Sequence, residues 1–258
     1  VKGSGKIQLQ KGFDEIDYII SSNGSDFHTI SNITLSELSL KNHQLTKKFF
    51  PEINGKINLK NHKININYKD DDLSVKGSGK IQLQKGFDEI DYTISKIKNK
   101  FNFNTKLNLD ETLLKIDNLN YKKEINSKIQ LILVGDYIKN KGLNLNKLSI
   151  LGKNSRIILK NLILDEENKI IKVDKIDLNY LDTQNKKNQF VIKVKQKNNY
   201  ELNGSIFNAN NLISDLLKSK EGEETKIFKN NINLILNLKE VYIDDINIVK
   251  NLKGKLNI

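Results

Sequence analysis

The sequence contains no cysteine, no methionine and no tryptophan. Without cysteine there is no thiol nucleophile, and no thiolate is present to join a histidine in holding a metal. A chain free of cysteine is compatible with an oxidising compartment but does not require one. The absence of cysteine therefore excludes thiol chemistry, but it does not indicate the compartment in which the protein is located.

Arginine is almost absent as well, since Arg156 is the only one in a chain whose net charge is +12. Lysine, asparagine and isoleucine dominate instead, a bias that the codons of an AT-rich genome would produce. Arginine usually makes the bidentate contacts of proteins that recognise nucleic acid. We therefore expect no nucleic-acid partner, whereas attraction to an anionic membrane surface stays open.

Long apolar runs are missing too. No segment approaches the roughly 18 residues of a transmembrane helix, and no signal peptide is recognisable. The chain begins at Val1 and ends within an alternating pattern at Leu256–Ile258. We therefore expect it to be a segment of a longer protein, whose other parts carry any membrane anchor.

Residue patterns for catalysis are scarce. His28, His43 and His62 match no metal-ligand spacing and are expected at the surface or at strand edges. Lys-Gly-Ser-Gly-Lys at 2–6 and 76–80 lacks the preceding glycine of a phosphate loop, and a flexible turn is the simpler interpretation.

The clusters of aspartate and glutamate match no calcium-binding or catalytic pattern either. Asp70-Asp71-Asp72 lacks the glycine and distal glutamate of a calcium loop, so we expect a polar hairpin tip. Asp14-Glu15 and Asp88-Glu89 are adjacent pairs, whose side chains point to opposite faces of a strand. We predict no enzyme, no metal site and no cofactor.

An internal repeat is the clearest feature that is present. Residues 1–18, VKGSGKIQLQKGFDEIDY, recur unchanged at 75–92, and matches such as Leu35 with Leu109 continue at the same spacing. The block has two interpretations, a tandem duplication or an assembly error that pasted a copy onto the start of the sequence. In both, the similarity of the units favours a repetitive architecture.

Apolar residues also recur at every second position in many short runs. This period predicts strands with one apolar face and one face of Lys, Asn, Gln and Asp. The runs recur about every 8 to 12 residues, as in meandering antiparallel strands. The residues predicted to line the apolar face are Ile129, Leu131, Leu133, Phe190, Ile192, Val194, Ile232, Leu234, Leu236 and Leu238.

One segment departs from this period, because Leu212, Ile213, Leu216 and Leu217 fall at helical spacing. The sequence therefore predicts an all-β protein with one short helix near 209–219. Its predicted segments are a β-rich repeat unit at 1–74, a β-groove segment at 75–207, the helix at 208–220 and further groove strands at 221–258.

The C-terminal half carries a more specific pattern. A strand with a glycine precedes paired leucines in Leu-Asn-Gly-Ser-Ile-Phe-Asn-Ala-Asn-Asn-Leu-Ile-Ser-Asp-Leu-Leu at 202–217. With the runs at 143–150, 156–164, 173–180 and 252–258, this stretch resembles the AsmA-like family, in particular its bridge-like lipid transporters of the YhdP and TamB type. Members often carry aspartate where Asn208 stands, so the chain departs from the pattern there.

The resemblance implies a long antiparallel, repetitive sheet curled into a taco-like groove that spans the periplasm of a double-membrane bacterium. Regions outside this segment would anchor it in the inner membrane. Phospholipid would move toward the outer membrane with its acyl chains on the ten predicted lining residues, and other envelope proteins are further candidate partners. The alternative that we keep is a structural or adhesive β-solenoid segment with no ligand.

Overall fold

The computed structural model describes residues 1–9, 13–23, 26–42, 44–53, 55–210 and 228–257. Strands make up 71% of the structure and pair mostly antiparallel, which confirms the predicted all-β fold. The chain separates into two compact units, Val1–Lys115 with Lys123–Lys139, and Ile116–Lys122 with Asn140–Ile258. This division follows packing, whereas the predicted segments followed the sequence repeat and the helical spacing near 208–220.

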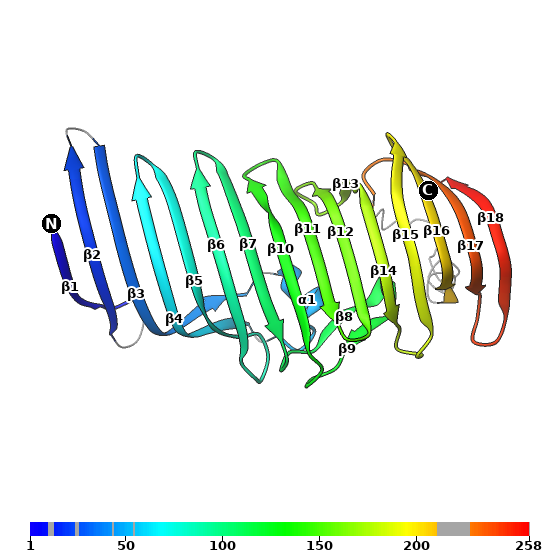
Figure 1. Ribbon diagram of the computed structural model, residues 1–258, viewed down its shortest axis with the longest axis horizontal. Coiled ribbons are helices and arrows are strands. Elements are labelled where there is room, and N and C mark those ends of the chain that lie inside the picture. The colour runs from blue at the N-terminus through cyan, green and yellow to red at the C-terminus, as the bar shows by residue number, and fades with distance from the viewer. Residues whose placement is uncertain (10–12, 24–25, 43, 54, 211–227, 258) are drawn as a thin grey trace. The chain divides into compact units, whose positions relative to one another are not determined.

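The strands of unit 1 lie side by side in chain order in one antiparallel sheet (Figure 1). They are β1 (Lys2–Ile7), β2 (Asp14–Asn23), β3 (Asp26–Lys41), β4 (Lys56–Lys69), β5 (Asp72–Gln82), β6 (Asp88–Ile97), β7 (Lys100–Leu109) and β10 (Ile129–Ile138). Between β7 and β10 the chain forms β8 (Leu114–Ile116), the 3-10 helix η1 (Asp117–Leu119) and β9 (Tyr121–Lys123).

A short helix that the sequence analysis did not predict, α1 (Gln44–Phe49), joins β3 to β4. It lies behind the sheet of unit 1 in the view of Figure 1. In the described part of the chain, no helix combines the length and the apolar character needed to cross a bilayer.

Unit 2 has the strand order β11 (Gly142–Gly152), β12 (Ser155–Leu164), β14 (Lys175–Leu181), β15 (Lys187–Gln196), β16 (Asn199–Asn208), β17 (Asn233–Tyr242) and β18 (Ile248–Asn257), with β13 (Ile170–Lys172) paired to β12. β16 and β17 pair in parallel, a departure from the predicted meander. A parallel pair needs a long crossover, which residues 209–232 supply. The predicted helix near 209–219 lies outside the described residues except for Ala209 and Asn210.

The sequence repeat is also a repeat of strand register. Gly3 pairs with Tyr18 as Gly77 pairs with Tyr92. The equivalence continues into the diverged third strand, where Ile16 pairs with Ile33 as Ile90 pairs with Leu107. The structural repeat is therefore a three-strand meander, β1–β3 and again β5–β7.

The turn between β4 and β5 shows how the local sequence sets the register. Asp70 and Asp71 have φ of 48° and 71°, and Lys69 pairs with Asp72 across the two-residue turn. Two central residues with positive φ match the twist of a hairpin, and aspartate tolerates that conformation. The predicted polar hairpin tip is confirmed, and it bonds to its own strand because the Tyr68 hydroxyl donates to Asp71 Oδ1 at 3.0 Å.

Candidate functional site

The apolar face of the sheet in unit 1 is continuous from strand to strand. Ile129 and Leu131 of β10 pair with Leu109 and Leu107 of β7, and Leu133 pairs with Thr105. Paired residues project from the same face of a sheet. The structure therefore brings the three predicted lining residues of this unit together on one face.

Unit 2 brings six other predicted lining residues together in the same way, in three rows across β15, β16 and β17. Phe190 pairs with Gly204 and Gly204 with Leu238, Ile192 with Leu202 and Leu202 with Leu236, and Val194 with Tyr200 and Tyr200 with Leu234. Gly204 is needed in its row, because a Cβ there would lie 2.5 Å from Phe190 Cβ and 2.7 Å from the carbonyl oxygen of Gln189. Ile232, the last predicted residue, precedes β17 and is buried.

Burial on the apolar face of unit 1 changes along the strands. At one end, Leu59, Ile81, Leu109 and Ile129 are all less than a tenth exposed. At the other end of the sheet, Ile94 of β6, Phe101 of β7 and Tyr137 of β10 are 38%, 37% and 43% exposed. One sheet face is thus core at one end and open to solvent at the other.

The covered end is closed by the chain that follows β5 and β7. The side chain of Gln84 pairs with the backbone of Leu113, donating to its carbonyl at 3.0 Å and accepting from its N–H at 2.8 Å. Leu83 and Leu113 are buried as a result. The Gln84 amide thus makes the pair of hydrogen bonds that the backbone of a neighbouring strand would make. These bonds hold the segment that contains Leu113 over the sheet.

A buried carboxylate holds the same segment. Asp88 accepts hydrogen bonds from the backbone N–H groups of Asp110 at 2.6 Å and Glu111 at 2.9 Å, and from the hydroxyl of Thr112. Lys123 donates to the carbonyls of Asp110 at 2.8 Å and Thr112 at 2.7 Å. Burial lowers the pKa of Lys123, and the negative charge of Asp88 opposes that effect.

We call the uncovered end of this face the open apolar strip. It contains Ile64, Ile66, Tyr68, Leu73, Val75, Tyr92, Ile94, Phe101, Phe103, Leu133 and Tyr137, all exposed or half-buried. Among the predicted lining residues of unit 1, Leu133 belongs to it, whereas Ile129 and Leu131 lie at the covered end. The sequence signal for the other residues of the strip was the alternation of apolar and polar residues along β4 to β7.

The apolar face of unit 2 is covered in part, and Ile192, Val194, Leu234 and Leu236 on it are half-buried. The Tyr180 hydroxyl donates to the carbonyl of Leu119 at 2.7 Å, and Tyr121 packs edge-on against the Tyr180 ring with 5.5 Å between centroids. Toward the other end of the strands, Phe228 lies 6.3 Å from Tyr200, centroid to centroid. The returning part of the crossover therefore packs on the apolar face.

Two expectations for individual motifs are wrong. His62 is fully buried rather than at the surface, and its Nε2 donates to the Lys80 carbonyl at 2.9 Å. The glycine-rich segment 76–80 lies within β5 rather than in a turn. Its glycines leave space for neighbouring rings, since a Cβ on Gly77 or Gly79 would clash with Tyr92 or His62 respectively.

The structure separates the adjacent carboxylate pairs as expected, since Asp88 is buried and Glu89 exposed. Within the described residues, no group of three or more His, Asp or Glu side chains is arranged to hold a metal ion. Comparisons with protein families, curated proteins and solved structures find no match to this chain.

Proposed function

We propose that this chain is a segment of a lipid-transport protein whose apolar sheet face carries acyl chains. The observation that carries the proposal is the open apolar strip, in which aliphatic and aromatic side chains from β4 to β10 are exposed or half-buried instead of lying in a core. Apolar side chains aligned across neighbouring strands form a patch of the kind that marks a binding surface.

The strip suits acyl chains because its side chains offer apolar contact. Val75, Ile94 and Phe103 form one row across β5, β6 and β7, and Leu73 and Phe101 belong to the next. Each methylene that leaves water for such a surface gains about 0.8 kcal/mol. An acyl chain lying across several strands therefore gains several kcal/mol without any specific polar contact.

A lysine lies within the strip and gives it a preference among lipids. Lys96 pairs with Leu73 on one side and Phe101 on the other, so its side chain projects from the apolar face at the solvent-exposed end. An ammonium group there provides a partner for a phosphate headgroup while the acyl chain covers the neighbouring rows. Phospholipid is accordingly the proposed cargo.

Transfer between the inner and outer membranes of a bacterial envelope, with the periplasm as the location, is the part of the proposal that the AsmA-like resemblance supports. The competing interpretation is a structural or adhesive segment without a ligand. The two differ in whether lipid accompanies the purified chain.

The test is native mass spectrometry of the purified chain, with extraction of bound lipid. Ile94→Asp places a charge on the open apolar strip, and Ser95→Asp places the same charge on the opposite face of the same strand. We expect phospholipid on the wild type and on Ser95→Asp, and little on Ile94→Asp. A folded, lipid-free wild type would contradict the proposal and favour the structural interpretation.

A further inference from the structure

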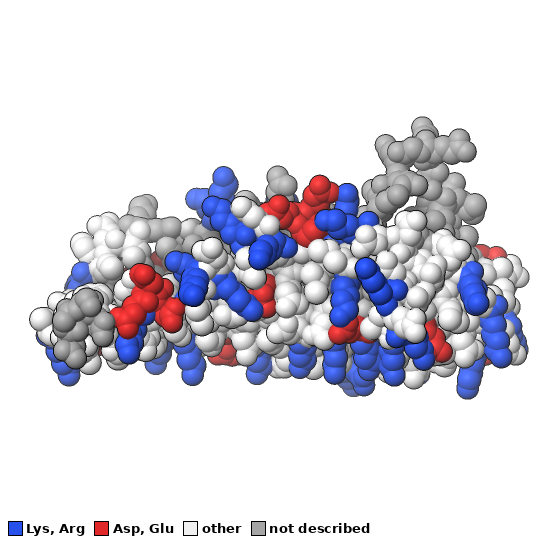
Figure 2. Space-filling model, turned by 90° about the horizontal axis from the view of Figure 1, so that it is seen from above, with Lys and Arg blue, Asp and Glu red and all other residues white. Residues whose placement is uncertain are grey.

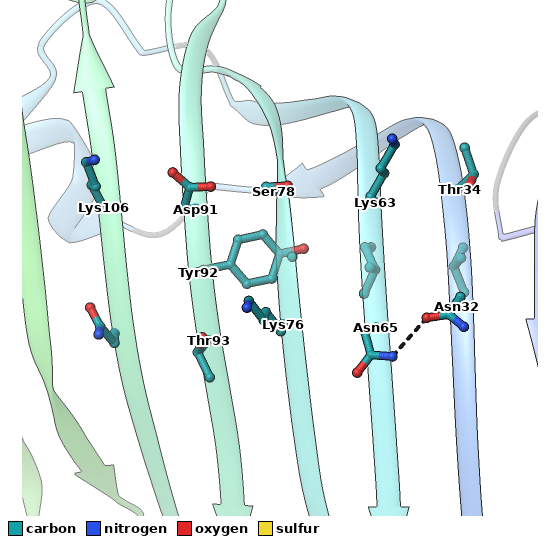
Figure 3. A pocket seen from close by; sticks show the side chains of 14 residues that line it. Asn32, Thr34, Lys63, Asn65, Lys76, Ser78, Asp91, Tyr92, Thr93 and Lys106 are labelled. Carbon is teal, nitrogen blue, oxygen red and sulfur yellow. Dashed lines mark hydrogen bonds between the residues drawn. The ribbon is translucent and has the colours of Figure 1, made fainter.

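The polar face of unit 1 has a hollow of about 570 Å³ that the lipid proposal does not use. Its floor is the backbone of Ile33, Ile64, Gly77 and Tyr92, and two rows of polar side chains stand on either side of that floor (Figure 3). We call it the polar hollow. The rows are Thr34, Lys63, Ser78, Asp91 and Lys106, and Asn32, Asn65, Lys76, Thr93 and Asn104.

The charges in the polar hollow are unbalanced. Lys63, Lys76 and Lys106 are exposed, and within the described residues none of them has an ion-pair partner. Asp91 pairs with Lys106 in strand register and is the single carboxylate of the lining. The lining itself carries three ammonium groups and one carboxylate, and Glu15 and Asp17 continue its two rows on β2. Figure 2 shows lysine side chains standing along the same face.

The repeat supplies an internal comparison. The equivalent hollow at the first copy, the twin hollow, has about 560 Å³ and is lined by Lys2, Ser4, Asp17, Ile19, Ile30 and Asn32 together with Gly3 and Tyr18. Its one lysine is matched by one aspartate. Ile19 and Ile30 stand where the polar hollow has Thr93 and Asn104, and Asn32 stands where it has Lys106. The twin hollow therefore has a similar volume with one lysine in its lining instead of three.

We propose that the polar hollow binds phosphate monoesters carried on a hydroxyl-rich ring, the chemistry of sugar phosphates and of phosphorylated polyol headgroups. The three lysines attract the phosphates. The amides of Asn65 and Asn104, the hydroxyl of Thr93 and the carboxylate of Asp91 offer donors and acceptors for ring hydroxyls.

Single-stranded nucleic acid fits this surface less well. Binding of that kind uses aromatic rings on which bases stack beside basic groups. The aromatic residue of the lining, Tyr92, directs its ring to the opposite face, where it packs over Gly77. The lysines of the hollow are therefore surrounded by amides and hydroxyls, and no aromatic ring of the lining is placed beside them for a base to stack on.

The binding test is isothermal titration calorimetry of the full chain at low salt with fructose 1,6-bisphosphate. A second arm measures co-sedimentation with phosphatidylcholine vesicles, with and without phosphatidylinositol 4,5-bisphosphate. The test variant is K63Q/K76Q/K106Q. The matched control is K2Q/K6Q/K69Q, which removes the same charge from exposed positions of the same unit outside the polar hollow.

We expect the test variant to weaken binding by about tenfold or more, and the control variant to change it by less than about twofold. Affinity for the free sugar bisphosphate supports a soluble ligand, and affinity for the phosphoinositide vesicles alone supports a lipid headgroup. Binding in neither arm, or equal losses in the two variants, would overturn the proposal. Circular dichroism of both variants checks that they are folded.

Discussion

Gly79 of β5 lies against the imidazole ring of His62 on β4, so that a Cβ on Gly79 would stand 2.7 Å from Cγ and 2.8 Å from Nε2 of the ring. Gly5 is its counterpart in the identical first copy of the repeat, and a Cβ there meets no atom within 4 Å. The same residue in the same sequence context therefore lies in different surroundings, because β5 pairs with β4 and β6 whereas β1, within the described residues, pairs with β2 alone.

Gly79→Ala is predicted to lower the free energy of unfolding by about 1–3 kcal/mol, because the His62 ring is buried and has little room to move. Gly5→Ala should change it by less than about 0.5 kcal/mol. Urea denaturation of both variants measures the difference. Equal effects would mean that the His62 contact does not constrain the strand pair.

His62 also predicts a pH dependence. Its Nε2–H donates to the Lys80 carbonyl, and its Nδ1 lies 3.4 Å from the Tyr92 hydroxyl, an arrangement that suits the neutral ring. Burial lowers the pKa of His62 below 6.5, while the bond to Lys80 opposes the shift. The unfolded chain therefore binds a proton first as the pH falls, and stability is lost as the pH drops below about 6.5.

The measurement is the free energy of unfolding between pH 7.5 and pH 5, above the range in which carboxylates titrate. We expect a decline for the wild type and a flatter profile for His62→Gln. If the two profiles decline in parallel, another group is responsible.

The two copies of the repeat also differ in the hydrogen bonds that their first aspartate, Asp14 or Asp88, accepts. Asp88 accepts from Asp110, Glu111 and Thr112, whereas the bond found for Asp14 comes from the backbone N–H of Ser36 at 2.7 Å. Asp88→Ala leaves several buried donors unpaired and removes the negative charge that most favours the Lys123 ammonium, so it should cost about 3 kcal/mol or more.

Asp14→Ala is the matched control and should cost about 1 kcal/mol. Thermal unfolding compares the two variants. In addition, hydrogen exchange at Leu113 should accelerate in Asp88→Ala, because the covering segment is released. A protected Leu113 in that variant would show that Gln84 alone holds the segment.

The period of two in the sequence was enough to predict which face of a strand is apolar. Phe190, Ile192 and Val194 align with Leu238, Leu236 and Leu234 because alternation is a local property of each strand. The sequence repeat likewise anticipated the equivalence of Leu35 and Leu109, both fully buried.

What covers that face could not be predicted, because it depends on contacts between residues far apart in the chain. Gln84 and Leu113 are separated by 29 residues, and their pairing decides which end of the sheet becomes core. The burial of His62 depends on a register shift in β4, where Asn61 adopts a φ of 52°. The parallel pairing of β16 and β17 depends on a crossover whose helical period says nothing about where the chain returns.

The most direct test of the lipid proposal is photocrosslinking from the two faces of one strand. A benzophenone amino acid replaces Phe103 on the open apolar strip or, as the control, its neighbour Asn102 on the polar face. Each protein is irradiated with phospholipid vesicles and analysed by mass spectrometry. The account predicts a phospholipid adduct at position 103 and little at position 102. No adduct at 103, or equal adducts at both positions, would contradict it.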